Sequence, residues 1–244
     1  VALNSIGKTE KAIEIHAKAI TMQEQLVKAE PGRPQFENHL ALYHLELGNA
    51  LFDYGKTEEA IEHYSNTITI AERLVKYHPD AIDYAIFEAK SHGRMATKYF
   101  DHGKPEEAIE HYSNAITITE RLVKDHPDDT DLRHGMAFSL ERLAAVFEHL
   151  GKVDEAIGCY NKCIVISLHL VRERPDQWVF AEGFGVYCRK LGDLLTRKSQ
   201  YNKAIEYYAK AITIFERLVN AESAAPPYYV RGFAVELAQT FSKF

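Results

Sequence analysis

The 244-residue sequence has few of the residues that interrupt helices or cross-link chains. It contains 8 prolines and 13 glycines, and most of them fall at regular intervals, which favours long uninterrupted elements over strands and tight turns. Its three cysteines, Cys159, Cys163 and Cys188, form no zinc-binding spacing. An odd number of cysteines, with no Asn-x-Ser/Thr acceptor, indicates a reducing, cytoplasmic setting.

Long hydrophobic runs and a strong excess of positive charge are also missing. No stretch approaches the roughly 18 apolar residues of a membrane span, and no basic-then-apolar leader opens the chain. The net charge of -6 gives no field that would attract nucleic acid. With 46% hydrophobic and 26% charged residues, the composition is that of a folded protein without membrane or nucleic-acid partners.

Sequence motifs of catalysis and metal binding are missing too. There is no Gly-x-Ser-x-Gly, no phosphate-binding glycine loop and no His-Glu-x-x-His. None of the 12 histidines pairs with another at the spacing of three or four that would aim two imidazoles at one ion. We therefore predict neither metal nor cofactor, and no enzyme. A catalytic alternative would have to combine residues such as Glu141, Arg142 and His149.

What the sequence does contain is a long internal repeat. Gly7, Gly55, Gly103 and Gly151 are spaced 48 residues apart, and Ser199 stands at the next step. Segments 55–80 and 103–128 differ only at Thr57/Pro105, Thr67/Ala115, Ala71/Thr119 and Tyr77/Asp125. Such similarity indicates a duplicated structural unit, because composition alone does not produce it.

Each unit contains two stretches with helical periodicity. After the glycine, Ala60, Tyr64, Ile68 and neighbouring apolar residues follow the three-and-four spacing of one helix face. This helix should end near residues 78–80, where proline disfavours helical geometry in the residue before it and Asp80 can cap the next helix. The second helix should end at Gly103, in a left-handed turn.

The pattern predicts an all-α fold, a superhelical solenoid of antiparallel helix hairpins. Each helix has about 20 residues, or roughly 30 Å, and a hairpin must stack on its neighbours to bury its faces. We expect a single domain over residues 1–244, with units beginning near 7, 55, 103, 151 and 199, giving about four full repeats plus partial ends. Because the chain begins at Val1 and ends in an apolar pattern at Phe241 and Phe244, we expect it to be part of a larger protein.

The repeat resembles the tetratricopeptide repeat, whose pattern includes Leu-Gly, Tyr, Ala and an aromatic residue. The Leu-Gly pair appears as Leu47-Gly48 and Leu191-Gly192. The alanine and the following aromatic recur at Ala60, Ala108, Ala156 and Ala204, and at Tyr64, Tyr112, Tyr160 and Tyr208. The position of the family's tryptophan holds His44, His92, Leu140 and Cys188, and the period is 48 instead of about 34. The 14 additional residues amount to seven, or about two turns, per helix.

The resemblance implies a protein-interaction scaffold that holds a peptide or helical partner in a concave groove. In this family the groove comes mostly from the helix that precedes the glycine. The residues at these positions are Asn49, Phe52, Lys90, Arg94, Thr97, Phe100, Arg142, His149, Arg189, Lys190, Asp193 and Arg197. The cations among them favour an acidic partner, because arginines would form ion pairs with its carboxylates. The simpler interpretation is that these charges form a solvated helix face.

Other interpretations concern the remaining aromatic and titratable residues. Tyr228, Tyr229 and Phe233 would cover the last hairpin or pair with another chain, which makes self-association through terminal helices the alternative function. The resemblance also allows a spacer or sensor module within a larger signalling protein. We expect structural roles for the histidines, with His63 and His111 on the polar side of their helices, and a buried inert thiol at Cys163.

Overall fold

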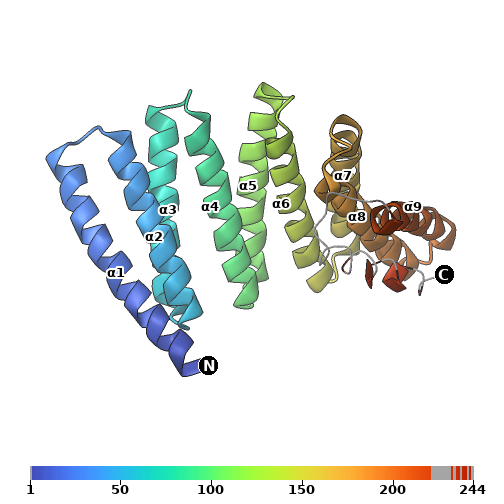
Figure 1. The fold of residues 1–244 in the computed structure, drawn as a ribbon, viewed down its shortest axis with the longest axis horizontal. Coiled ribbons are helices and arrows are strands. Elements are labelled where there is room, and N and C mark those ends of the chain that lie inside the picture. Colours follow the sequence, from blue (N-terminus) through green and yellow to red (C-terminus); the bar gives the residue numbers. More distant parts are fainter. Residues whose placement is uncertain (1, 221–231, 233–234, 237, 241, 243–244) are drawn as a thin grey trace. The chain divides into compact units, whose positions relative to one another are not determined.

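The computed structural model describes residues 2–220, 232, 235–236, 238–240 and 242, and these contain helices but no strand. Tyr228, Tyr229, Phe233, Phe241 and Phe244 lie outside them. The helices are α1 (Ala2–Ala29), α2 (Pro34–Asp53), α3 (Thr57–Tyr77), α4 (Ile82–Asp101), α5 (Pro105–Asp125), α6 (Thr130–His149), α7 (Val153–Glu173), α8 (Trp178–Arg197) and α9 (Tyr201–Asn220) (Figure 1). The prediction of an all-α repeat fold is confirmed.

The chain forms two compact units, residues 1–122 and 123–244. In the first unit α1 packs on α2, α2 on α3 and α3 on α4; in the second, α6 packs on α7, α7 on α8 and α8 on α9. Successive helices within a unit are antiparallel (Figure 1). From α2 onward the helices have 20 or 21 residues, the predicted length. The single domain over residues 1–244 stays a prediction.

Three of the repeated glycines end the even-numbered helices as expected. Gly55, Gly103 and Gly151 have φ of 90°, 73° and 69°, in the left-handed region that glycine adopts without strain. Ser199 occupies the same turn with φ of 58°, although it carries a side chain. By contrast, α1 continues through Gly7 without a turn.

The opposite ends of the hairpins are set by prolines, and here one expectation is wrong. Helix α3 ends at Tyr77, two residues before Pro79, as predicted. Asp80 does not cap α4, because the residue in the cap position is Ala81, which has no side-chain acceptor. In the next repeat the capping residue is Asp129, whose carboxylate accepts hydrogen bonds from the amides of Asp131 and Leu132.

The repeated tyrosines lie in the helical core of each unit. Tyr64, Tyr112, Tyr160 and Tyr208 are at most 3% exposed, which confirms the predicted packing role. A Cβ atom at Gly48 would lie 2.7 Å from Cε1 of Tyr64, and one at Gly192 would lie 2.6 Å from Cε1 of Tyr208. The Leu-Gly glycine therefore makes room for the tyrosine ring of the following helix.

Candidate partner-binding surface

The predicted partner-binding residues all lie on the even-numbered helices. Six belong to the first unit, on α2 and α4: Asn49, Phe52, Lys90, Arg94, Thr97 and Phe100. The other six belong to the second unit, on α6 and α8: Arg142, His149, Arg189, Lys190, Asp193 and Arg197. Each set is therefore considered within its own unit.

Two residues of the first set hold the core tyrosines. The hydroxyl of Tyr64 donates to Oδ1 of Asn49 at 2.9 Å, and the hydroxyls of Tyr112 and Thr97 lie 2.8 Å apart. Both polar side chains are half-buried. Asn49 and Thr97 thus satisfy buried phenols, which would otherwise lose the free energy of an unmade hydrogen bond.

The charged residues of the first set differ in how far acids neutralise them. Arg94 is exposed and lies 3.9 Å from Glu46, a separation at which an exposed pair contributes little. Lys90 is exposed and has no ion pair within the described part of the chain. Lys98 lies over the half-buried ring of Phe52, with its Nζ 4.0 Å from the ring centroid. Lys90 and Arg94 remain accessible to a partner.

In the second set, most cations already have acidic partners. Nε of Arg189 donates to Glu236 at 2.7 Å, and its Nη1 lies 3.4 Å from Asp193. The side chain of Arg189 is only 12% exposed. This guanidinium is therefore part of the fold and is not a free anion-binding group.

Glu148 lies close to two further cations of the second set. Its carboxylate accepts a hydrogen bond from the Tyr160 hydroxyl at 2.8 Å and lies 3.9 Å from both Lys190 and Arg197. Burial, together with the charge of Glu148, raises the pKa of Tyr160 well above its usual range. The sequence did not reveal this carboxylate, because the repeat-equivalent residues are Phe52, Phe100 and Thr196.

Arg142 is the exposed arginine of the second set with an aromatic neighbour. Its guanidinium carbon lies 4.9 Å from the ring centroid of Phe138, which is 50% exposed. The two residues are four apart on α6 and share one face. This exposed cation-π pair leaves one side of the aromatic ring open to a ligand.

The residues of the catalytic alternative are not arranged as a catalytic group. Burial raises the pKa of Glu141, while Arg142 and Lys190 act in the opposite direction. Glu141 and His149 are eight residues apart on α6, which separates them by roughly 12 Å along the helix axis.

Four of the histidines form two pairs between helices, which the sequence analysis did not predict. Nδ1 of His44 lies 2.8 Å from Nδ1 of His63, and His92 and His111 repeat this contact at the same distance. The expectation that His63 and His111 occupy a polar helix face is therefore wrong, because each turns toward a buried histidine of the preceding helix. Burial lowers the pKa of all four imidazoles, that of His92 to about 4.

The cysteines are buried thiols, as predicted for Cys163. Cys163 and Cys188 are 0% exposed and Cys159 is 8% exposed. Burial raises the pKa of Cys159 to about 11 and that of Cys188 to about 12. Because the thiolate is the reactive form, these thiols are inert.

Comparison with known proteins agrees with this architecture. Profiles of the tetratricopeptide repeat match residues 94–128 and 187–217. A search of curated protein sequences gave no significant match.

None of the described helices is both long and apolar enough to cross a membrane.

Solved structures with the same arrangement of helices are distant in sequence. BtubC (BKLC) from P. vanneervenii is 19% identical, with a TM-score of 0.66 over 96% of this chain and 83% of that one. A putative kinesin light chain from Podosopora anserina with nearly identical TPR-like repeats is also 19% identical, with a TM-score of 0.61 over 88% and 90%. MamA is 20% identical, with a TM-score of 0.51 over 91% and 95%.

These similarities and the stacked hairpins define a helical-repeat protein of the solenoid class. More specifically, the two profile matches identify tetratricopeptide repeats at residues 94–128 and 187–217, and the internal period of the chain is 48 residues.

Proposed function

We propose that the chain is a protein-interaction scaffold whose even-numbered helices bind an acidic peptide or helix. The tetratricopeptide-repeat family supports protein partners in general, and the surface of these helices supports the finer proposal. The proposal depends most on the exposed pair of Arg142 and Phe138, which offers a cation and an apolar ring on one face of α6.

Repeat-equivalent positions on the other even-numbered helices have related chemistry. The equivalents of Phe138 are Leu42, Lys90 and Val186, and the equivalents of Arg142 are Glu46, Arg94 and Lys190. Leu42 is 37% exposed. Three of four helices thus place a large apolar side chain at the first position, and three of four place a cation one turn later. This combination suits a ligand that carries both apolar and acidic side chains.

Ion pairs and hydrogen bonds within the second unit support some of the proposed contact residues more than others. Ion pairs or hydrogen bonds within the second unit already involve four of these residues: Arg189, Lys190, Asp193 and Arg197. Lys90, Arg94 and Arg142 are exposed, whereas Arg197, which is also exposed, shares the 14% exposed carboxylate of Glu148 with Lys190. We therefore assign the main electrostatic contribution to Lys90, Arg94 and Arg142. Phe138 joins the set as an apolar contact.

The test is binding of peptides to the chain before and after charge reversal. Peptides selected from a random library on the wild-type chain should be enriched in acidic and large apolar residues. Arg94→Glu with Arg142→Glu should weaken their binding by roughly 100-fold, about 2.7 kcal/mol for two charge-assisted contacts. Far-UV circular dichroism should show unchanged helicity.

The control makes the same change in net charge on odd-numbered helices. Lys124 on α5 and Arg172 on α7 are exposed, and Lys124→Glu with Arg172→Glu should leave peptide affinity within about two-fold. Equal losses in both double variants would indicate a general effect of net charge and would overturn the assignment to α4 and α6. Light scattering of the unliganded chain separates the alternative, because self-association makes the mass depend on concentration.

A further inference from the structure

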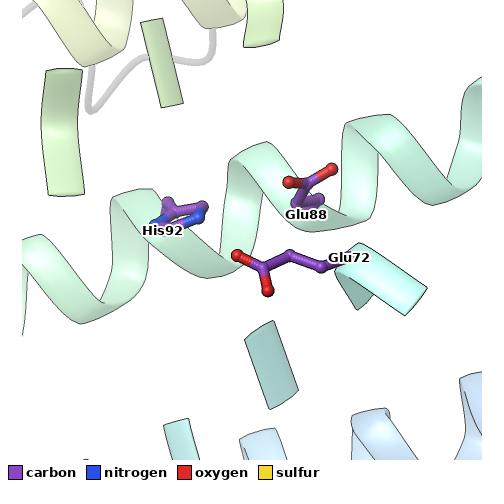
Figure 2. A group of neighbouring side chains, drawn as sticks. All are labelled: Glu72, Glu88 and His92. Atoms are coloured by element: carbon purple, nitrogen blue, oxygen red, sulfur yellow. The ribbon is translucent and has the colours of Figure 1, made fainter. Parts of the chain in front are cut away.

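Two glutamates and a histidine gather between α3 and α4. Glu88 and His92 lie one turn apart on α4, and Glu72 comes from α3 (Figure 2). Oxygen and nitrogen atoms of the three side chains all lie within 4.8 Å of one another. The cluster lies entirely within the first unit.

Helix packing does not explain the presence of Glu88 in this cluster. In the other repeats the equivalent residues are Leu40, Met136 and Phe184, of which Leu40 and Phe184 are buried. Glu88 therefore places a half-buried carboxylate where the fold otherwise uses an apolar side chain. Burial and the charge of Glu72 raise the pKa of Glu88, while Arg121 acts in the opposite direction. A carboxylate at this position costs stability unless a cation joins it.

His92 is oriented by a second imidazole. Its Nδ1 lies 2.8 Å from Nδ1 of His111, on α5, and the His92 side chain is buried. When His92 donates its Nδ1–H to His111, its Nε2 carries a lone pair. A hydrogen bond from the non-ligating nitrogen is how metal-binding histidines are commonly held in one tautomer and orientation.

We propose that Glu72, Glu88 and His92 bind a divalent first-row transition ion such as Zn²⁺, which ties α3 to α4. Two carboxylate oxygens and one imidazole nitrogen form a mixed set that suits such ions better than Mg²⁺ or Ca²⁺, which prefer oxygen ligands alone. Three protein ligands leave at least one coordination position for water. Ligands of a tetrahedral ion lie roughly 3.4 Å apart at bond lengths near 2.1 Å. Separations of up to 4.8 Å in the cluster therefore need to shorten by up to about 1.4 Å, which the exposed side chain of Glu72 allows.

The first repeat offers a matched control for this site. It has His44, paired with His63 as His92 is with His111, and Glu24 at the position of Glu72. At the position of Glu88 it has Leu40. The first repeat therefore contains the orienting histidine and two of the three ligands, and the proposal assigns it no site.

The test is calorimetric titration of the chelator-treated chain with ZnCl₂, followed by thermal unfolding with and without the ion. The wild-type chain should bind one Zn²⁺ and melt at a higher temperature when it is bound. Glu88→Leu, the residue of the first repeat, should weaken binding at least about ten-fold and remove the metal-dependent shift. Because this variant replaces a carboxylate with the residue that the fold uses elsewhere, it should remain folded without metal.

The reciprocal variant tests the same idea by gain of binding. Leu40→Glu should raise the stoichiometry from one Zn²⁺ to two, by joining Glu24 and His44. Equal Zn²⁺ binding by the wild-type chain and Glu88→Leu would show that other histidines hold the ion and would overturn the proposal. Binding of Mg²⁺ with no binding of Zn²⁺ would also overturn it.

Discussion

Substitution of Gly185 by alanine tests whether a close contact between α8 and α9 limits residue size. A Cβ atom there would lie 2.8 Å from Cζ of Phe215 and 3.0 Å from its Cε1. Carbon atoms in contact lie about 3.5 Å apart or more, so the ring would have to withdraw by roughly 0.7 Å. Phe215 is 0% exposed, and overpacking of such a site costs about 1–3 kcal/mol. Since alanine gains about 1 kcal/mol in helix propensity over glycine, we expect a net destabilisation of up to about 2 kcal/mol.

Two further variants separate the effect of the Phe215 contact from the effect of the helix propensity of alanine. Gly135 on α6 has no heavy atom within 4 Å of its would-be Cβ, so Gly135→Ala should stabilise the chain by about 0.5–1 kcal/mol. The equivalents of Gly185 and Phe215 in the preceding repeat are Ala137 and Ser167, both buried. Adding Phe215→Ser to Gly185→Ala relieves the overlap but removes a large buried ring, so the two free-energy changes should not be additive.

The assay is urea unfolding followed by circular dichroism at 222 nm, with midpoint and slope fitted together. Opposite signs of the midpoint shift for Gly185→Ala and Gly135→Ala are the expected result. Stabilisation by both would refute the reasoning, because the Phe215 contact would then impose no limit on size at position 185.

Three further predictions concern polar and strained positions. Ser199→Gly should stabilise the chain by about 1 kcal/mol in urea unfolding, because a residue with a side chain now holds a positive φ. Tyr208→Phe should cost about 1–2 kcal/mol in the same assay, because the hydroxyl donates to the Asp193 carboxylate at 2.8 Å. Burial lowers the pKa of His44 and of His63 below 6.5, so the unfolded chain binds more protons and stability should be full above about pH 6.5 and fall as the pH drops below it. His44→Leu with His63→Cys, which copies the third repeat, should make this acid-side loss shallower in melts between pH 7 and 5, and an unchanged slope would contradict it.

Much of the fold could be predicted from the sequence, because the helical periodicity of the apolar residues and the positions of glycine and proline indicate the same helices. The spacing of Gly55, Gly103 and Gly151 set the hairpin ends, and the recurring tyrosines identified the core. The capping role of Asp80 was predicted wrongly, because the chain needs one more residue before α4 begins, at Ile82.

The candidate surface was harder to predict, because its charges depend on pairs between helices. The sequence of α8 alone suggests that Arg189 and Lys190 lack acidic partners. In the structure Glu236 pairs with Arg189, and Glu148, on α6, lies near Lys190. His92 and His111 are likewise 19 residues apart, on different helices, so a spacing of three or four residues on one helix does not reveal their contact. Side chains that meet across a helix pair leave no spacing in a single helix to detect.

The near-duplication of α3 and α5 means that the folding chain must choose between two almost identical partners for α2. In the native pairing, Oγ1 of Thr67 donates to the carbonyl oxygen of Ala41 at 3.2 Å, and Ala71 is fully buried. Helix α5 has these two residues in reverse order, with Ala115 and Thr119. If α5 took the place of α3, the Ala41 carbonyl would lose this hydroxyl donor and a larger residue would enter the position of Ala71. A hydroxyl group moved by one helical turn therefore distinguishes the correct pairing from its copy.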